Sequence, residues 1–332
     1  MSPVAAAWVF AALATVPVPA NVRAAADQAL PLLLKAADGH IRKQTCFACH
    51  NQALPMFAFH AARGHGFAID DEAVAEQTEF VADFLKRNKD KFLKGQGTGG
   101  QADTAGYALL TLELGGCKPD ETTAAVAGYL LKYQADKDHW HVTSNRPPSE
   151  ASDFTTNYLC LRGLRAFGTK DQQDAIAKRT EAVRGWLLKT MAKDTEDRVF
   201  RLLGLKEAGA SADTIREAAA VLAKTQRADG AWSQLDGKAG DAYATGSALV
   251  ALHQAGGLAV TDPAYLRGVW FLLRTQAADG SWRIKSRSKP FQPYYESGFP
   301  YGTDQFISAT ASGWATAALA LACEPAKAVG RK

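Results

Sequence analysis

Apolar residues recur along the chain with the spacing of amphipathic helices, and two kinds of helix alternate. The first kind is an apolar run that ends in basic or polar residues, as in VAGYLLKYQ (126–134) and GVWFLLRTQ (268–276). Related segments lie at 30–35, 80–87, 183–190 and 219–226. Because these segments lack the sustained alternation of apolar and polar residues that marks strands, we predict an all-α chain.

The second kind of helix opens with a polar residue and is rich in small and apolar side chains. Segments of this kind lie at 103–116, 153–168, 196–209, 241–257 and 304–322. Asp or Thr near a helix start accepts hydrogen bonds from unpaired backbone N–H groups, and Gly ends several of these segments. A sixth member is expected after 30–35, where 45–66 has a matching length, an apolar face and a Gly-rich end. Six alternating hairpins predict an (α/α)6 toroid with the small-residue helices inside.

All inner helices of such a toroid run in one direction, so their N-termini meet at one end around a central cavity, which is the predicted site. Polar residues near the helix starts and adjoining loops surround this end: Asp103, Asp153, Asp241, Tyr243, Asp304 and Arg146. We take Asp103, Tyr243 and Asp304 as candidate catalytic residues, and a helix-capping role is the alternative for each. The insertion at 283–302 is either a lid over the cavity or an ordinary packed loop.

Three helices of the first kind run into related turns. Gln226 to Trp232 reads QRADGAW, Gln276 to Trp282 reads QAADGSW, and 134–140 is a degenerate copy, QADKDHW. Asp-Gly forms turns that a Gln amide can fasten to the backbone, so their first role is structural. These copies resemble the QW repeats of squalene–hopene and oxidosqualene cyclases, and the chain is identified as a member of the terpenoid cyclase/protein prenyltransferase α/α-toroid superfamily. The resemblance implies a deep apolar pocket and does not transfer an activity.

The chain departs from the catalytic motifs of that superfamily. Class II cyclases protonate a polyene with an acid in a D-x-D-D-T-A motif at an inner-helix start, and the nearest match here is 101–105, QADTA. It keeps Asp103, Thr104 and Ala105 but lacks the paired carboxylates that would tune the acid, which argues against class II cyclisation. The zinc ligands of protein prenyltransferases are not found either, because Asp241 and Asp304 have no nearby Cys.

Cys46-Phe47-Ala48-Cys49-His50 has the C-x-x-C-H pattern of covalent haem c attachment. Two thioethers hold the haem vinyl groups, and His50 is placed as the proximal iron ligand. We predict one covalent haem c at 46–50. Two other interpretations stay open: a redox disulfide, although its usual βαβ context is absent, and a zinc site, although no second C-x-x-C or H-x-x-x-H completes the ligands. Followed by NQALP (51–55), the motif also resembles a group of exported bacterial squalene-cyclase-like proteins.

Met56 and His60 follow His50 along one helix, so neither easily reaches the distal face of the iron, and better candidates come from other hairpins. His139 and His141, which flank Trp140 in the degenerate turn, are the predicted distal candidates. For each, a surface histidine in a turn is the alternative. Another distal candidate is His40. Arg146 is a candidate partner for a carboxylate or a haem propionate.

The composition and the N-terminal segment indicate a folded, exported protein rather than a nucleic-acid-binding one. With 332 residues, 47% of them hydrophobic, the chain can bury a large core. A net charge of +4 without long charge runs argues against nucleic-acid binding and gives no sign of membrane association. Residues 4–18 are apolar and precede small-residue cleavage sites at 18–20 and 22–24, so we predict a signal peptide (1–20) and a periplasmic or otherwise exported protein. An uncleaved anchor and a short interfacial helix stay open as alternatives.

These expectations give one toroid domain at 21–325, a disordered tail at 326–332 and a leading function. We expect an exported c-type haem protein whose cavity binds an apolar lipid or isoprenoid, acting as an oxidoreductase with a redox partner protein. One alternative is an electron-transfer or haem-dependent binding protein without catalysis. The other is a cyclase-like isomerase without haem.

Overall fold

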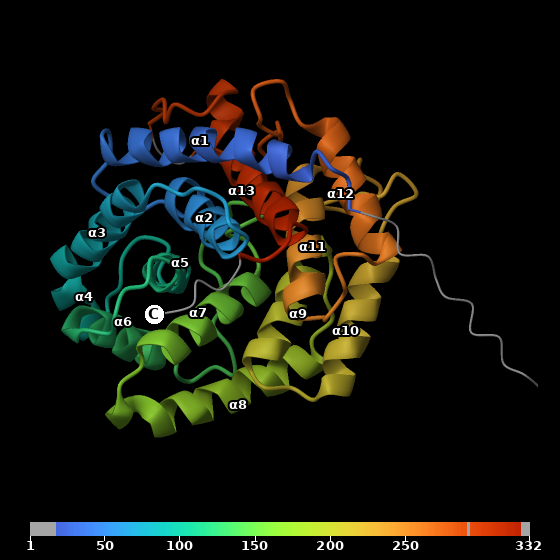
Figure 1. The fold of residues 1–332 in the computed structure, drawn as a ribbon. Coiled ribbons are helices and arrows are strands. Elements are labelled where there is room, and N and C mark those ends of the chain that lie inside the picture. Colours follow the sequence, from blue (N-terminus) through green and yellow to red (C-terminus); the bar gives the residue numbers. More distant parts are fainter. Residues whose placement is uncertain (1–17, 291–292, 327–332) are drawn as a thin grey trace, which may run out of the picture.

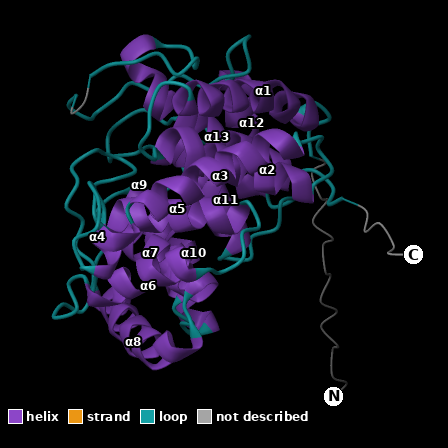
Figure 2. Ribbon diagram, turned by 90° about the vertical axis from the view of Figure 1, so that its left-hand side faces the viewer, coloured by secondary structure: helices purple, strands orange, loops and turns teal. Residues whose placement is uncertain are grey.

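The computed structural model describes residues 18–290 and 293–326, and within these ranges the chain folds into helices and loops without a strand (Figure 2). The α-helices are α1 (Val22–Ile41), α2 (Leu54–Gly64), α3 (Asp71–Arg87), α4 (Lys89–Leu93), α5 (Ala102–Leu114), α6 (Glu121–Lys132), α7 (Asp153–Phe167), α8 (Gln173–Lys189), α9 (Thr195–Glu207), α10 (Ala212–Lys224), α11 (Ala242–Gln254), α12 (Pro263–Thr275) and α13 (Gln305–Leu321). Single turns lie at Cys49–Ala53 (η1, π-helical), Lys170–Gln172 (η2) and Gly302–Asp304 (η3). The predicted all-α class is confirmed.

The helices form two concentric rings (Figure 1). In the described part of the chain, α2, α5, α7, α9, α11 and α13 form the inner ring, and α13 closes it by packing against both α2 and α11. The outer ring holds α1, α3, α6, α8, α10 and α12, with the short α4 following α3. The helices thus alternate between the rings along the chain, as expected of an α/α toroid.

Burial explains why the two helix types have different sequences. Every residue of α11 from Ala242 to Leu252 is buried, whereas α10 buries only Ala218 and Leu222. Inner helices also approach closely at glycines: a Cβ at Gly246 would lie 2.6 Å from the carbonyl carbon of Trp314 on α13. Small residues are therefore required where inner helices touch, and outer helices need only one apolar stripe.

The QW turns fasten outer helices to their neighbours. Trp140, Trp232 and Trp282 are fully buried. Each indole N–H donates a 2.9 Å hydrogen bond to the carbonyl of the residue ten positions earlier, in the preceding outer helix. The Gln226 amide donates both to Gly230 O, in its own turn, and to Ala264 O on α12. The structural role predicted for these turns matches these contacts.

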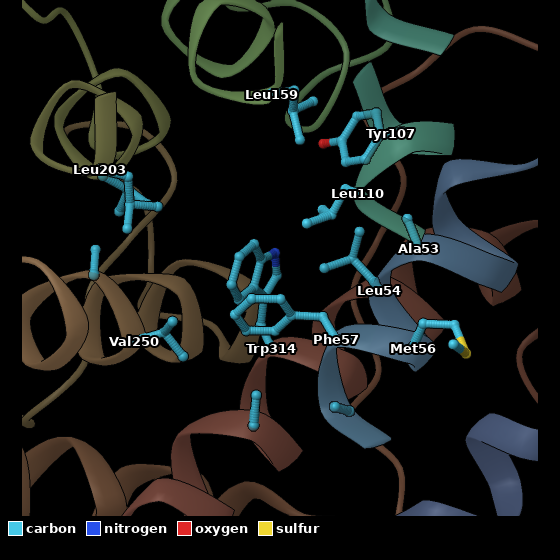
Figure 3. Packing of buried hydrophobic residues seen from close by; sticks show 14 of the residues in the cluster. Ala53, Leu54, Met56, Phe57, Tyr107, Leu110, Leu159, Leu203, Val250 and Trp314 are labelled. Carbon is cyan, nitrogen blue, oxygen red and sulfur yellow. The ribbon is translucent and has the colours of Figure 1, made fainter. Parts of the chain in front are cut away.

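Aromatic side chains from several inner helices meet inside the ring (Figure 3). The rings of Phe57 (α2) and Trp314 (α13) have centroids 4.9 Å apart, and the centroids of Phe200 (α9) and Trp314 are 6.2 Å apart. Large side chains thus join helices from different parts of the ring into one core.

The predicted signal peptide lies outside the described residues except for 18–20, and the predicted tail lies outside them except for Ala326. Helix α1 begins at Val22, which is 1% exposed. Among the residues that the structure describes, no helix combines the length and apolarity needed to cross a bilayer.

Candidate functional site

A pocket of about 470 Å³ lies at the end of the toroid where inner helices begin, and we call it the mouth pocket. Phe306, Ile307 and Thr310, at the start of α13, form one wall. The insertion at 283–302 contributes another wall through residues such as Lys285 and Tyr294. The insertion therefore forms part of the wall of the mouth pocket.

A second pocket, of about 410 Å³, adjoins the C-x-x-C-H segment, and we call it the motif pocket. Its lining residues are His40, Cys46, Phe47, Ala48, Cys49, His50, Phe84, Asn88, Lys91, Thr98, Gly99, Gly100, Thr104, Arg146 and Glu150. His50, Arg146 and Glu150 line both pockets. These three side chains form a shared wall between the motif pocket and the mouth pocket.

The C-x-x-C-H segment enters the inner ring through η1. Cys46 is exposed, whereas the buried Cys49 donates a 2.8 Å hydrogen bond from its thiol to Glu150 Oε1. Gln52 Oε1 accepts from the Ala48 N–H at 2.9 Å and so supports the turn. The motif was expected to begin the inner helix directly. Instead the α-helix begins at Leu54, and the π-helical turn precedes it.

The imidazole of His50 sits at the shared wall with one nitrogen unused. Its Nδ1 lies 3.5 Å from Cys49 Sγ, while Nε2 is buried and has no hydrogen-bond partner. The ring packs on Phe306 with centroids 4.9 Å apart. Burial, together with the nearby His40 and Arg146, lowers the pKa of His50 to about 3. The ring is therefore neutral, with a buried nitrogen available to a ligand.

His40 connects the motif to the insertion. Its Nε2 lies 2.7 Å from Cys46 O and its Nδ1 lies 2.6 Å from the Tyr295 hydroxyl. Asn51 donates a 3.2 Å hydrogen bond to the same hydroxyl. Both ring nitrogens of His40 are thus engaged in holding the motif and the insertion together.

The half-buried Arg146 and the buried Glu150 form an ion pair, reinforced by an antiparallel backbone bridge between the same two residues. Burial raises the pKa of Glu150, and the adjacent guanidinium opposes this rise. Sequence reasoning singled out Arg146 but missed Glu150. Within 142–152, no motif marks Glu150, and its contact with Cys49 joins residues far apart in the chain.

Asp103 is buried one residue after the start of α5. Its Oδ1 accepts a hydrogen bond from the Thr156 hydroxyl on α7, while Oδ2 has no partner. Burial raises the pKa of Asp103 to about 7, although the Thr156 hydrogen bond opposes the rise. Asp103 lines neither of the two pockets, whereas its neighbour Thr104 lines the motif pocket.

The other candidate catalytic residues differ in position. Tyr243 is buried and donates a 3.0 Å hydrogen bond to Glu196, and neither residue lines the two pockets. Asp304 lines the mouth pocket and accepts a 2.9 Å hydrogen bond from the Ser286 N–H of the insertion. Of the candidate catalytic residues, only Asp304 faces the mouth pocket. Asp241 caps α11 through the Ala244 N–H.

His139 and His141 do not line either pocket with His50. Both contact the Asp153 carboxylate at the start of α7. The His139 ring also stacks on Trp186 with centroids 4.3 Å apart. These contacts hold the pair outside the pockets, so the structure does not bring the predicted distal ligands to His50.

Sequence comparison places this architecture in a family. Residues 160–331 match the squalene-hopene cyclase C-terminal domain, and this stretch is more than half of the chain. The chain belongs to the squalene-hopene cyclase C-terminal domain family. No curated protein matches it in sequence.

Solved structures share the fold of this squalene-hopene cyclase family member. The type II terpene cyclase MstE from Scytonema, in its apo form, is 14% identical with a TM-score of 0.57, over 90% of this chain and 97% of that chain. A variant of MstE in complex with geranylgeranyl dihydroxybenzoate is 15% identical with a TM-score of 0.58, over 91% and 97%. A protein from Actinoplanes is 15% identical with a TM-score of 0.57, over 91% and 99%. These similarities show the fold alone.

The family match leaves the C-x-x-C-H segment unexplained. Matched residues begin within α7 and continue through α13, which includes the two well-formed QW turns. Cys46 to His50, Asp103, Arg146 and Glu150 all precede the matched stretch. Membership of the squalene-hopene cyclase C-terminal domain family therefore accounts for the ring and not for the chemistry at the shared wall.

Proposed function

We propose that the chain is an exported c-type haem protein that binds an apolar molecule at the mouth of its toroid and acts on it as an oxidoreductase. One observation carries this proposal: His50 sits in the wall between the motif pocket and the mouth pocket, with a buried Nε2 that lacks a partner. A buried polar atom without a hydrogen bond costs about 1–3 kcal/mol. Such an atom favours a ligand at that position.

The residues around the motif pocket fit haem c. Cys46, Cys49 and His50 line one pocket and supply the two thiols and the imidazole that attachment needs. The pocket volume, about 410 Å³, lies in the range of ligand sites, and the cations Lys91 and Arg146 on its wall suit the propionate carboxylates. Bound haem supplies one-electron or oxygen chemistry, which protein side chains do not provide.

The environment of Cys49 would change on attachment. As a free thiol, Cys49 donates to Glu150 Oε1, whereas a thioether sulfur has no proton to donate. Glu150 would then lose the hydrogen bond from Cys49 and keep its ion pair with Arg146. The positive charge of Arg146 would still balance the negative charge of the Glu150 carboxylate at the shared wall.

The mouth pocket supplies the apolar binding surface. Phe306 and Ile307 line it from α13, and Pro147, Pro290 and Pro293 line it from the loops. The exposed Lys285 and Lys289 lie at its rim, where they favour a ligand with an acidic group. The MstE complex with geranylgeranyl dihydroxybenzoate supports an isoprenoid as the class of ligand.

A ligand titration tests the proposal. The haem-loaded protein is titrated with a soluble isoprenoid carboxylic acid while its Soret band is followed. We expect a saturable spectral shift in the wild type and weaker binding in Phe306→Ala, because the Phe306 ring lines the mouth pocket and packs against His50. Val221→Ala, on the outer face of α10, serves as the control. Absence of a saturable shift, or equal affinity in Phe306→Ala, contradicts the proposal.

The spin state separates catalysis from simple electron transfer. A high-spin ferric spectrum indicates an open coordination position and supports oxidoreductase activity at the mouth. A six-coordinate low-spin spectrum supports the alternative, an electron-transfer or binding protein with a redox partner and without catalysis.

Asp103 favours a second candidate, cyclase-like acid catalysis without haem. It occupies the Asp-Thr-Ala match at the start of an inner helix and has a buried, unpaired Oδ2. Against this candidate, Asp103 lines neither pocket and lacks the second carboxylate of the cyclase motif. Cyclised product from a polyene, lost in Asp103→Asn and retained without haem, would favour the cyclase.

A further inference from the structure

A cluster of possible metal ligands lies outside both pockets, between the degenerate QW turn and α7. It consists of His139, His141 and Asp153. One ligand atom from each residue lies within 4.8 Å of the others, the only such group found in the part of the chain that the structure describes. The family resemblance does not account for this cluster, because neither well-formed QW turn has a histidine beside its Trp.

The buried Trp140 fixes the two histidines on one side of the turn. Its indole is fully buried, and its backbone N–H donates to Asn157 Oδ1 at 3.0 Å. Asn157 Nδ2 donates back to the Trp140 carbonyl at 2.8 Å. Because this pair of hydrogen bonds joins the turn to the first part of α7, His139 and His141 are held close to Asp153, the first residue of that helix.

The distances between ligand atoms suit a small divalent cation. Asp153 Oδ2 lies 3.0 Å from His141 Nδ1 and 3.4 Å from His139 Nε2. Tetrahedral zinc with bonds of about 2.0–2.1 Å separates its ligand atoms by about 3.3 Å. The other carboxylate oxygen, Oδ1, is occupied by the Val142 N–H at 2.7 Å, which orients Oδ2 toward the two rings.

Asp138 and Trp186 hold the His139 ring in an orientation that suits a metal ligand. Its Nδ1 lies 2.7 Å from Asp138 Oδ1, and Lys189 Nζ donates to Asp138 Oδ2 at 2.8 Å. The ring stacks on Trp186 with an interplanar angle of 10°. A carboxylate on one ring nitrogen orients the other nitrogen toward a metal, an arrangement common around protein-bound metals. His139 Nε2 is therefore the nitrogen available to the cation.

We propose that His139, His141 and Asp153 form a binding site for a divalent transition metal, with zinc as the cation that this donor set suits. Two imidazoles and one carboxylate supply three ligands, and a water completes the fourth position on the exposed side, where the His141 side chain is 68% exposed. The site is distinct from Cys46 to His50, because none of its three residues lines the motif pocket or the mouth pocket.

The proposed metal site lies at both ends of the segment that carries two residues of the shared wall. His141 and Asp153 bracket the segment 142–152, which carries Arg146 and Glu150. A cation bound to both ends closes this loop and restricts its unfolded states. Metal binding therefore stabilises the segment that separates the two pockets.

Calorimetric titration with zinc chloride tests the site on chelator-treated, haem-loaded protein. We expect one equivalent to bind in the wild type, with an affinity at least about 10-fold lower in His141→Ala. Asp138→Asn changes the contact to His139 Nδ1 and the ion pair with Lys189 but no proposed metal ligand, and it should lower the affinity about 10-fold to 100-fold. His60→Ala, which removes an exposed histidine elsewhere, serves as the control and should bind as the wild type does.

A second variant separates this site from the cysteines. Cys46→Ser/Cys49→Ser removes the thiols and the haem attachment together, so retention of the zinc equivalent in it supports the site whatever the fate of the haem proposal. Cobalt bound to this variant should show a ligand-field spectrum without a thiolate charge-transfer band. The proposal is overturned if zinc does not bind saturably, or if a folded His139→Ala/His141→Ala variant binds it with unchanged stoichiometry and affinity.

Discussion

At the scale of single residues, several carboxyl groups near the starts of the inner helices are buried, and their hydrogen bonds only partly offset the effect of burial on their pKa values. Burial raises the pKa of Glu196 well above its usual value, although Thr155 and Tyr243 donate hydrogen bonds to it. The same cause raises the pKa of Asp241 to about 6. These carboxyls hold protons in the folded state that the unfolded chain releases at lower pH.

Asp103 allows the effect of one such carboxyl on stability to be measured. Its pKa is raised by burial to about 7, so the folded state keeps a proton that the unfolded state loses near pH 4. Its contribution to stability is full below about pH 4 and is lost as the pH rises toward about 7. The loss amounts to at most about 4 kcal/mol.

We expect Asp103→Asn to weaken this dependence, because Asn mimics the protonated acid. Urea unfolding between pH 4 and pH 8 should show the stability of the wild type falling relative to that of the variant. Parallel curves for the two proteins would show that Asp103 titrates normally in the folded state.

At the scale of helices, close approach within the inner ring depends on small residues. Gly246 on α11 lies directly against the backbone of α13, with the carbonyl carbon of Trp314 2.6 Å and the nitrogen of Ala315 2.7 Å from an added Cβ. Backbone atoms cannot rotate away as a side chain can. A methyl group here must push the two helices apart.

Gly246→Ala should therefore destabilise the protein by about 1–3 kcal/mol, the usual effect of overpacking. Gly185→Ala on the outer helix α8 is the matched control, since a Cβ there meets nothing within 4 Å, and it should stabilise by about 0.4–1 kcal/mol. Denaturant unfolding of both variants measures the difference. Equal effects of the two substitutions would refute the close packing of α11 and α13.

The sequence predicts the helices and turns better than it predicts the contacts between side chains of different hairpins. Alternating helix types and the buried Trp of each QW turn are local signals, and the rings follow from them. The bond from Cys49 to Glu150 and the meeting of His139 with Asp153 depend on how separate hairpins pack. A linear pattern does not carry that information, so the sequence predicted the rings but gave no signal for Glu150 or for the contact of His139 with Asp153.

At the scale of the whole molecule, the contacts at the start of α1 favour one of the two predicted signal-peptide cleavage sites. Val22 and Ala26 are buried, and Arg23 donates to His65 O at 2.7 Å and stacks on Phe67. Cleavage after Ala20 keeps all these contacts, whereas cleavage after Ala24 removes Val22 and Arg23. We predict that the exported protein begins at Asn21, which intact mass after secretion would establish. A mature start at Ala25 would contradict this prediction.

The two pockets meet at one wall of the molecule, and we propose that haem c is attached there. Intact mass under denaturing conditions, after expression with the c-type haem maturation genes, tests it most directly. We expect one covalently bound haem in the wild type and in Cys117→Ser, and none in Cys46→Ser/Cys49→Ser. A wild-type protein that is fully exported and folded, yet carries no covalent haem, would contradict it.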